Sequence, residues 1–421
     1  MNSRPSTPRP AGRAPAGARG FVPALEGLRA LAALGVLTTH VAFQTASSTG
    51  SPLHRVWGRL DLAVAVFFAL SGFLLWRGHA VHARSGAPGT ARPAGAYLRS
   101  RLARIMPAYL VLVVTALVLL PGNADSGPVT WLANLTLTQV YVPRTLTDGL
   151  THAWSLSVEM SFYLVLPLLW WALAGLRGGR ARWRVPVLLG AGALSLLWAL
   201  VPWHALGLPA GLNDQILPPA FGSWFAAGMV LAELAAAPPG RMAALARGRR
   251  ARWGWWALAA AAFLATTVPS WFAEGFVHPS GPEFAARTAL GALLAFALLA
   301  PVVLAPARLG FPLLGSAPLR ALGRWSYGVF LWHVLVLYYA FQVVDVPQFS
   351  HHMPAVWAVT VAVTVVVAAA SYALVEEPAR RALDRAEARR TAARAPGHAA
   401  ATPAQARPDS VASCGPGPSP A

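Results

Sequence analysis

The chain has 421 residues, of which 56% are hydrophobic and only 12% are charged, and its mean hydropathy is +0.50. This composition excludes an ordinary soluble protein and predicts an all-α, polytopic integral-membrane helical bundle. The formal net charge of +19 does not indicate nucleic-acid binding, because the basic residues fall between apolar runs and not along one soluble face. The single cysteine, Cys414, excludes a disulfide framework and a cysteine-based metal site, and we expect no metal.

Residues 1–20 are rich in Pro, Arg, Ala and Gly, and we expect them to form a disordered basic arm. About ten transmembrane helices are predicted from the apolar runs that follow. These runs lie near residues 24–45, 60–80, 105–121, 152–176, 184–202, 217–236, 254–272, 287–307, 321–342 and 354–375. The predicted membrane domain covers residues 21–379, and residues 380–421, rich in Ala, Arg and Pro, are expected to be a disordered cytoplasmic tail.

The distribution of arginine gives the orientation of these helices. Short cytoplasmic loops of membrane proteins collect positive charge. With the N-terminus inside, the inner segments hold every arginine except Arg55, Arg59, Arg144 and Arg287. Because removing or adding one central helix would destroy this alternation, the sequence predicts that both termini are cytoplasmic.

Two histidines are expected at a similar depth within the bundle. Eleven residues separate Arg29 from His40, which puts both side chains on one helix face, roughly 16 Å apart along the axis. If Arg29 lies at the membrane surface, His40 lies near mid-bilayer. His333 follows the inner end of another predicted helix, at Arg324, by about the same distance. A titratable ring at this depth is costly and is a candidate for function.

Two further groups of polar residues stand out in the sequence. Ser155, Glu159 and Tyr163 recur every four residues, which places them on one face of a helix. The inner loop between the second and third helices carries a cationic cluster, made of Arg99, Arg101 and Arg104. Guanidinium groups in such a cluster suit a polyanionic ligand, for example a phosphate-bearing cofactor.

Each feature also has a purely structural interpretation. His40 could be a packed histidine bonded to a neighbouring carbonyl, and His333 could belong to an aromatic layer. Glu159 could be the ion-pair partner of an arginine. The three arginines of the inner loop could simply follow the positive-inside rule. Asp61, at the outer end of the second helix, could be a cap or an interface residue.

Six motifs follow one another between residues 24 and 378. They are Ala24-Leu25-Glu26-Gly27-Leu28-Arg29-Ala30 with His40; Asp61-Leu62 with Val66-Phe67-Phe68-Ala69-Leu70-Ser71-Gly72-Phe73-Leu74; Tyr97 to Pro107 with its Arg101-Leu102-Ala103-Arg104; Trp154 to Leu164; Leu322 to Gly328 with His333; and Ser371-Tyr372 with Val375-Glu376-Glu377-Pro378. In this order they resemble the membrane-bound acyltransferase 3 family, whose members O-acylate carbohydrates and some natural products. Glu26 stands where the family usually has Asp, and Trp325 replaces a smaller residue.

The resemblance implies a multi-pass plasma-membrane O-acyltransferase. Such an enzyme moves an acetyl or other short acyl group from acetyl-CoA or another acyl-CoA to a hydroxyl of a carbohydrate, glycolipid or glycosylated natural product. No cofactor is expected to stay permanently bound. Acyl transfer to a hydroxyl needs a base with a pKa near neutrality, which suits His40, with Glu159 as the carboxylate that orients it.

By the same resemblance and by charge, the phosphates of acyl-CoA would be bound by arginines, namely Arg29, Arg101, Arg104 and Arg99. Other candidate site residues are Glu26, Ser71, Tyr163, Tyr327 and His333. A proton-coupled transporter or a lipid or glycan flippase is the alternative, since buried histidines and a carboxylate also suit transport. No inverted repeat between the two halves of the chain supports it. The sequence leaves open which hydroxyl is acylated, from which side it arrives, and the oligomeric state.

Overall fold

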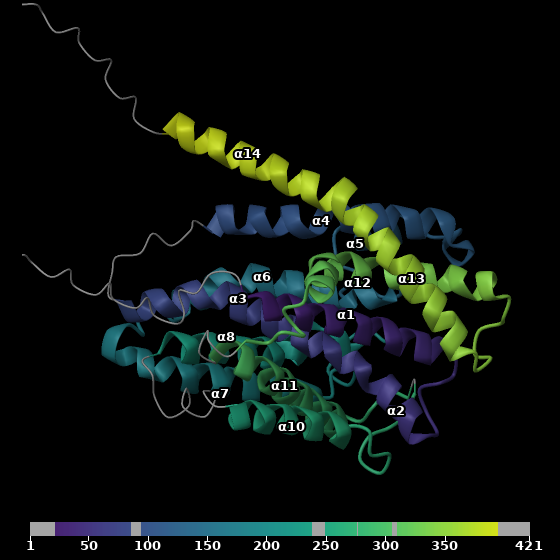
Figure 1. Ribbon diagram of the computed structural model, residues 1–421, viewed down its shortest axis with the longest axis horizontal. Coiled ribbons are helices and arrows are strands. Elements are labelled where there is room, and N and C mark those ends of the chain that lie inside the picture. Colours follow the sequence, from purple (N-terminus) through teal and green to yellow (C-terminus); the bar gives the residue numbers. More distant parts are fainter. Residues whose placement is uncertain (1–21, 86–93, 238–248, 276, 305–309, 395–421) are drawn as a thin grey trace, which may run out of the picture.

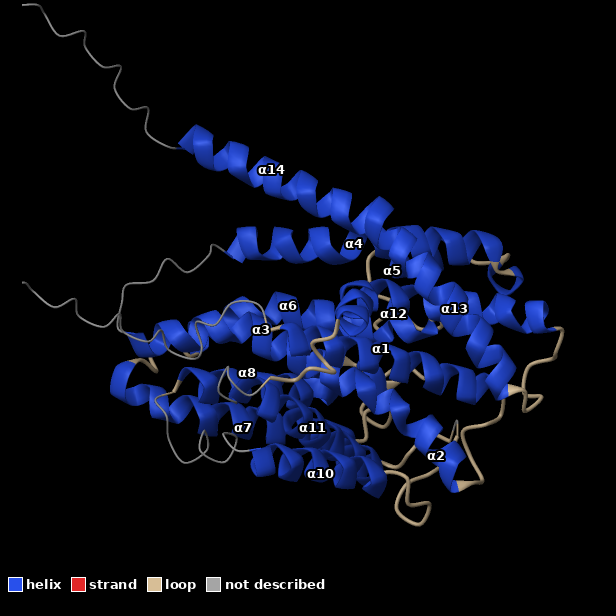
Figure 2. Cartoon of the chain, viewed as in Figure 1, coloured by secondary structure: helices blue, strands red, loops and turns tan. Residues whose placement is uncertain are grey.

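The computed structural model describes residues 22–85, 94–237, 249–275, 277–304 and 310–394. In these ranges the chain forms helices joined by turns and loops, without a β-strand, and most of the long helices run side by side (Figures 1 and 2). The predicted basic arm, residues 1–20, lies outside the described residues.

The α-helices are α1 (Pro23–Gln44), α2 (Pro52–Arg59), α3 (Ala63–Ser85), α4 (Ala94–Leu119), α5 (Pro128–Leu135), α6 (Trp154–Ala172), α7 (Arg184–Leu196), α8 (Gly222–Ala236), α10 (Arg249–Ala265), α11 (Gly281–Leu304), α12 (Ala317–Val344), α13 (Met353–Ser371) and α14 (Glu377–Arg394). The short 3-10 helices are η2 (Leu60–Leu62), η3 (Pro121–Asn123), η4 (Thr151–Ala153), η5 (Gly178–Trp183), η6 (Leu197–Leu200), η7 (Asp214–Ile216) and η8 (Pro218–Phe221), and η9 (Tyr372–Glu376) is a π-helical turn.

Eight helical segments of the described chain are long and apolar enough to cross a membrane. They are Pro52–Ser85, Ala94–Leu119, Thr151–Ala172, Gly178–Leu200, Pro218–Ala236, Gly281–Leu304, Ala317–Val344 and Met353–Arg390. Because the polar groups of a helix backbone bond to one another, helices are the natural way for so apolar a chain to cross lipid. The protein is therefore a multi-span membrane protein.

The prediction of about ten spans also counted the segments that form α1 and α10. The described part of α10 has 17 residues, which is short for a span. The 22-residue helix α1 is less apolar because it carries Glu26, Arg29 and His40. It packs against α12, α3, α2, α13 and α11, and a helix enclosed by others exposes little surface to lipid. The total of ten and the cytoplasmic location of both termini stay predictions.

Close packing of two helix pairs depends on glycine. Where α1 meets α12, a Cβ at Gly323 would collide with the Glu26 carbonyl, and one at Gly27 would collide with the carbonyl of Leu314 in the turn just before α12. On α3 and α8, a Cβ at Gly72 would collide with the carbonyl of Phe225. Helices in lipid associate through such small residues, because lipid gives no hydrophobic drive between them. The glycines of the first, second and fifth motifs thus set the spacing of the helices that carry the candidate site residues.

Two boundaries differ from the prediction. The cationic cluster predicted in an inner loop lies on α4, whose first turns extend the apolar run by eleven residues rich in helix-forming Ala, Leu and Arg. The predicted tail boundary at residue 380 falls inside α14. Residues 380–394 are helical and not disordered, because Ala and Arg favour helix and Glu377 pairs with Arg381 at 2.5 Å. Residues 395–421 lie outside the described chain.

A buried ion cluster ties α3, α7 and α8 together. Glu233 on α8 is fully buried and accepts hydrogen bonds from Trp76 Nε1 at 2.6 Å and Arg184 Nε at 2.7 Å, and a further one from Arg84. Arg184 also donates to the Leu173 carbonyl at 2.9 Å. A buried charge is stable only when it is paired and hydrogen-bonded, as it is here.

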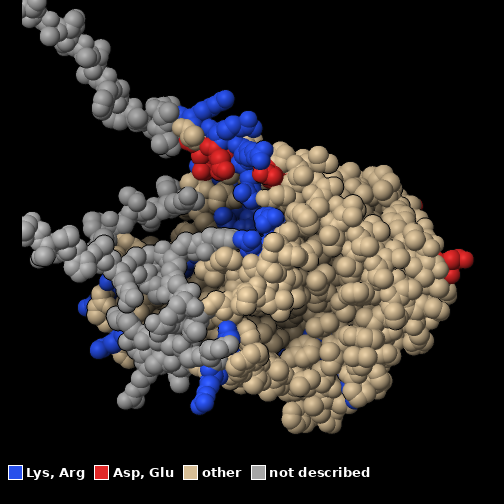
Figure 3. All heavy atoms as spheres, viewed as in Figure 1, with Lys and Arg blue, Asp and Glu red and all other residues tan. Residues whose placement is uncertain are grey.

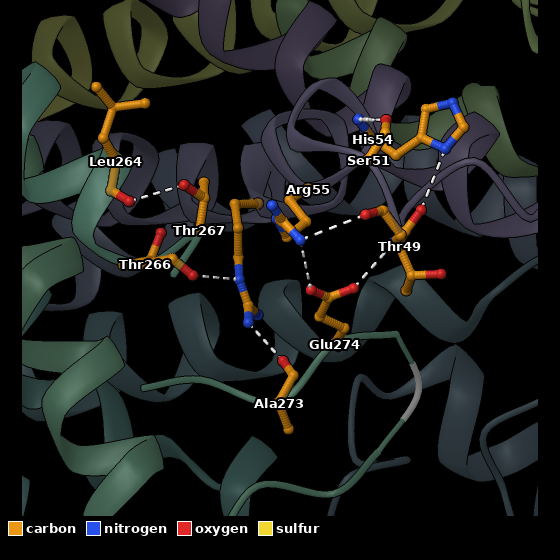
Figure 4. Close-up of polar contacts among 11 residues, drawn as sticks. Thr49, Ser51, His54, Arg55, Leu264, Thr266, Thr267, Ala273 and Glu274 are labelled. Carbon is orange, nitrogen blue, oxygen red and sulfur yellow. Dashed lines mark hydrogen bonds and ion pairs between the residues drawn. The ribbon is translucent and has the colours of Figure 1, made fainter. Parts of the chain in front are cut away.

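A second polar network joins α2 and the loop before it to the segment between α10 and α11 (Figure 4). Glu274 accepts from Arg55 at 3.3 Å and from the Gly50 amide at 3.0 Å. Arg59 donates to the carbonyls of Thr266 at 2.8 Å and Ala273 at 2.5 Å. Three of the four arginines predicted to face outward, Arg55, Arg59 and Arg287, therefore line one small cavity at this end of the bundle. On the face drawn in Figure 3, charged side chains gather instead on α14 and the end of the bundle beside it.

Candidate active site

One cavity of about 310 Å³ brings together polar residues from five helices. Its polar lining comes from α1, α3, α4, α6 and α12, and consists of Arg29, Ser71, Arg77, Arg101, Arg104, Ser155, Glu159, Tyr163, Ser326 and Tyr327. This volume is at the lower end of the range usual for small-molecule sites. Of the eleven residues selected from the sequence, seven line this one space.

The arginines reach the cavity because of helix periodicity. Arg101 and Arg104 are three residues apart and share one face of α4, whereas Arg99 is rotated by about 200° from Arg101 and is exposed. The structure therefore does not place Arg99 with the others. Arg77 on α3, which sequence reasoning counted only as an inner-side charge, lines the cavity.

The predicted stripe on α6 faces the same space. Ser155, Glu159 and Tyr163 all line the cavity. The Glu159 carboxylate accepts hydrogen bonds from the Tyr163 hydroxyl at 2.6 Å and from the Ser71 hydroxyl of α3. In the described residues neither an arginine nor a histidine forms an ion pair or a hydrogen bond with Glu159, so the ion-pair interpretation does not hold.

Two other candidates hold the walls of the cavity. The Tyr327 hydroxyl donates to the carbonyl of Ile105 at 2.7 Å, which joins α12 to α4 next to the arginines. Glu26 does not line the cavity, but its carboxylate lies 4.0 Å from Arg29. Four guanidinium groups and one carboxylate thus line the cavity, and this excess of positive charge in a partly desolvated site favours a polyanion.

The two predicted histidines are in contact, and a third joins them. His333 Nε2 lies 3.3 Å from His40 Nδ1. The ring of His152, from η4 just before α6, lies 4.8 Å from the His333 ring and 6.2 Å from the His40 ring, centroid to centroid. His152 and His333 are buried. Sequence reasoning missed His152, whose only signal was a histidine at the start of an apolar run, two residues before the fourth motif.

Backbone carbonyls determine which ring nitrogens carry hydrogen. His40 Nδ1 lies 2.8 Å from the Val36 carbonyl and His333 Nδ1 lies 2.7 Å from that of Phe330, so both Nδ1 atoms are donors. In the neutral rings, Nε2 then carries the lone pair. His152 Nε2 faces the carbonyl of Leu331 at 3.1 Å, and its buried Nδ1 has no hydrogen-bond partner in the described chain. His40 does bond to a neighbouring carbonyl, as the purely structural interpretation supposed. This bond uses only Nδ1, however, and leaves Nε2 available for proton transfer.

Phe330 lies between the cavity and two of the histidines, His152 and His333. It lines the cavity, and its ring lies 5.2 Å from the His152 ring and 5.8 Å from the His333 ring. Glu159 cannot orient His40 in this arrangement. His152 occupies the level of the histidines, and Glu159, seven residues farther along the same segment, lies roughly 10 Å away along the axis, among the arginines.

Comparison with known proteins adds to this geometry. A family model described as an acyltransferase domain matches residues 22–376. The chain belongs to the acyltransferase 3 family. All three histidines and all four cavity arginines lie within the matched residues. No solved structure matches the chain.

Three proteins similar to this chain are named as acyltransferases or O-acetyltransferases. The chain is 30% identical over 396 residues to an acyltransferase, MdmB, of Streptomyces mycarofaciens, covering 89% of this chain and 95% of that protein. It is 26% identical over 389 residues to a putative peptidoglycan O-acetyltransferase, YrhL, of Bacillus subtilis, and 24% identical over 387 residues to a peptidoglycan O-acetyltransferase, OatA, of Listeria monocytogenes. Each of these two alignments covers 86% of this chain but spans only 55% and 56% of the respective relatives. The protein is therefore a membrane acyltransferase by family.

Proposed function

We propose that this protein is a plasma-membrane O-acyltransferase that moves an acetyl or other short acyl group from acyl-CoA to a hydroxyl of a carbohydrate, glycolipid or glycosylated natural product. The observation that carries the proposal is a cavity with four arginines that ends, at Phe330, against a contacting pair of histidines. The relatives named as peptidoglycan O-acetyltransferases support a carbohydrate acceptor.

The donor is bound through its phosphates. Arg29, Arg101 and Arg104 converge from α1 and α4, and guanidinium groups bind phosphate oxygens in pairs of short hydrogen bonds. Arg77 adds a fourth positive charge from α3. Glu159, held by Ser71 and Tyr163, stays in the middle of the cavity, where its role is to fix the positions of these hydroxyls.

His40 is the general base, and His333 is the residue that orients it. His40 Nε2 takes the proton of the acceptor hydroxyl while the hydroxyl oxygen bonds to the thioester carbonyl carbon. The carbon–sulfur bond then breaks, and the leaving CoA sulfur takes the proton back from Nε2. Throughout, His40 Nδ1–H faces Val36 O and the lone pair on His333 Nε2, which stabilise the positive charge that His40 carries between the two steps.

Isotope-labelled acetyl-CoA and purified protein in lipid nanodiscs test the donor part of this proposal. Arg101→Ala combined with Arg104→Ala should weaken acetyl-CoA binding by at least about 100-fold, since each charge-assisted contact contributes about 1.5–3 kcal/mol. The matched control is Arg99→Ala, on the same helix but exposed, which should bind like the wild type. Equal affinity in all three proteins would remove the arginines from the donor site.

The acceptor is identified separately. Glycans and small metabolites from a strain without the protein should lack one acyl increment in mass spectrometry, and the wild-type gene should restore it. A His40→Ala gene should not restore it, whereas His204→Ala, an exposed histidine elsewhere, should. If the protein instead moves a glycan or metabolite to the opposite side of the membrane without any covalent change, transport replaces acyl transfer as the function.

A further inference from the structure

The cavity is long, and its two ends differ in chemistry. Along α3 its lining runs from Val64 to Arg77, thirteen residues apart, which corresponds to roughly 20 Å of helix. Arg77 marks one end, Ser71 with its bond to Glu159 lies in the middle, and Val64 and Phe67 mark the other end. A ligand with phosphates at one end and an apolar group at the other fits this order.

The apolar end is closed by Phe330 of α12. Phe330 is only 7% exposed, and its ring centroid lies 6.3 Å from that of Phe67 on the opposite wall. Behind Phe330 are the rings of His152 and His333. The same side chain is therefore the end wall of the cavity and the partition in front of the histidines.

We propose that Phe330 is the specificity-determining residue that limits the length of the acyl group. This inference rests on the proposed function, because it takes the apolar end as the position of the acyl chain. A short acyl group that reaches Phe330 holds its thioester carbonyl only a few atoms from the wall, close to the histidines. Each added methylene pushes the carbonyl back toward the arginines and away from His40, because the end of the chain cannot pass Phe330.

The expected change in acyl-length preference can be estimated from how strongly closed apolar pockets discriminate between ligands of different length. One methylene too many in a closed apolar pocket changes selectivity by about 10- to 200-fold. The wild type should therefore bind acetyl-CoA and propionyl-CoA well and hexanoyl-CoA and octanoyl-CoA at least tenfold more weakly. Phe330→Ala removes the end wall, and its preference should move by at least tenfold toward hexanoyl-CoA.

Binding experiments measure the acyl-length preference even though the acceptor is not identified. Acetyl-, propionyl-, butyryl-, hexanoyl- and octanoyl-CoA are titrated by calorimetry into wild-type protein and variants in nanodiscs. Release of free CoA thiol in the presence of each donor gives a second readout, the rate of transfer to water. The matched control is Phe296→Ala, which removes a phenylalanine ring from α11, where it packs on Trp255 at 5.7 Å and does not line the cavity.

The outcomes distinguish the role of Phe330 in acyl-length selection from the assignment of acyl-CoA as the donor. A longer preferred chain in Phe330→Ala, with the wild-type profile in Phe296→Ala, supports the inference. An unchanged profile in Phe330→Ala overturns it and leaves acyl-CoA as the donor intact. If the wild type binds none of the five thioesters, the donor assignment itself is wrong and the inference falls with it. If Phe330→Ala does not fold, Phe330→Leu is used instead, because it removes a smaller part of the end wall. An unchanged acyl-length profile in Phe330→Leu likewise overturns the inference.

Discussion

At the scale of single residues, the chemistry depends on which nitrogen of His40 is free. The Val36 carbonyl holds hydrogen on Nδ1, so the proposed base is Nε2. His40→Asn separates the two roles, because the asparagine amide still donates to the Val36 carbonyl but has no basic atom. We expect acyl transfer to fall by about 10²- to 10⁴-fold, the usual contribution of a general base, while acetyl-CoA affinity stays unchanged.

The measurement is single-turnover transfer from labelled acetyl-CoA in membranes, beside binding to the purified variant. His204→Asn, at an exposed histidine, is the control. Near wild-type transfer by His40→Asn would assign the base to another group. His152 is then the first to examine, because its buried Nδ1 carries a free lone pair.

His333 gives a second prediction at this scale. Its Nε2 faces His40 Nδ1 at 3.3 Å, whereas its Nδ1 bonds to the Phe330 carbonyl. His333→Asn keeps the donor to that carbonyl and removes the acceptor that faces His40. Loss of one such interaction costs about 1–3 kcal/mol, so kcat should fall by about 5- to 150-fold while the KM for acyl-CoA stays the same. A change in KM with kcat intact would make His333 a packing residue.

At the scale of elements, the positions of α1 and α12 decide where Arg29 points. Gly323 lies against the carbonyl of Glu26, one turn before Arg29. Gly323→Ala forces the two helices apart, and overpacking of this kind costs about 1–3 kcal/mol. We expect a lower Tm in detergent and a higher KM for acyl-CoA. Gly78→Ala, on an exposed part of α3 with nothing near its Cβ position, should neither lower the Tm nor raise the KM, since alanine favours helix more than glycine does. An unchanged Tm for Gly323→Ala would mean that the α1–α12 contact is loose.

Helix periodicity explains why much of the site could be predicted from the sequence. The four-residue spacing of Ser155, Glu159 and Tyr163 and the three-residue spacing of Arg101 and Arg104 each define one face, and both faces line the cavity. Counting residues from the inner end also gave similar depths for His40 and His333, which are in contact. Which residues share a face and how deep each residue lies are properties of a single helix, so residue spacing alone is enough to predict them.

The sequence does not show which residues of different helices come into contact. Glu159 was assigned to His40, but its partners are Ser71 and Tyr163, because rotation and rise place it among the arginines. His152 and Phe330 join the site only through packing of η4 and α12, for which neither has a local signal. The predicted count of ten spans treated α1 like any other run, although its packing against five α-helices reduces its need for apolar side chains.

At the scale of the whole molecule, function requires the arginine cavity to open toward the side that contains acyl-CoA. The predicted topology puts that side, and both termini, in the cytoplasm. The turn between α12 and α13 should then lie outside, and Gln348 in this turn is exposed. The outer network of Arg55 and Glu274 should face the same way.

The single cysteine makes this topology directly measurable, since Cys414 is the only thiol in this 421-residue sequence. A membrane-impermeant maleimide should leave Cys414 unlabelled in intact cells and label it once the membrane is permeabilised. In a Cys414→Ser background, Gln348→Cys should be labelled in intact cells, because nine spans precede this turn in the predicted topology and an even number would be needed to hide it. Labelling of Cys414 in intact cells would reverse the orientation, place the arginines on the side without acyl-CoA, and exclude it as the donor for this cavity.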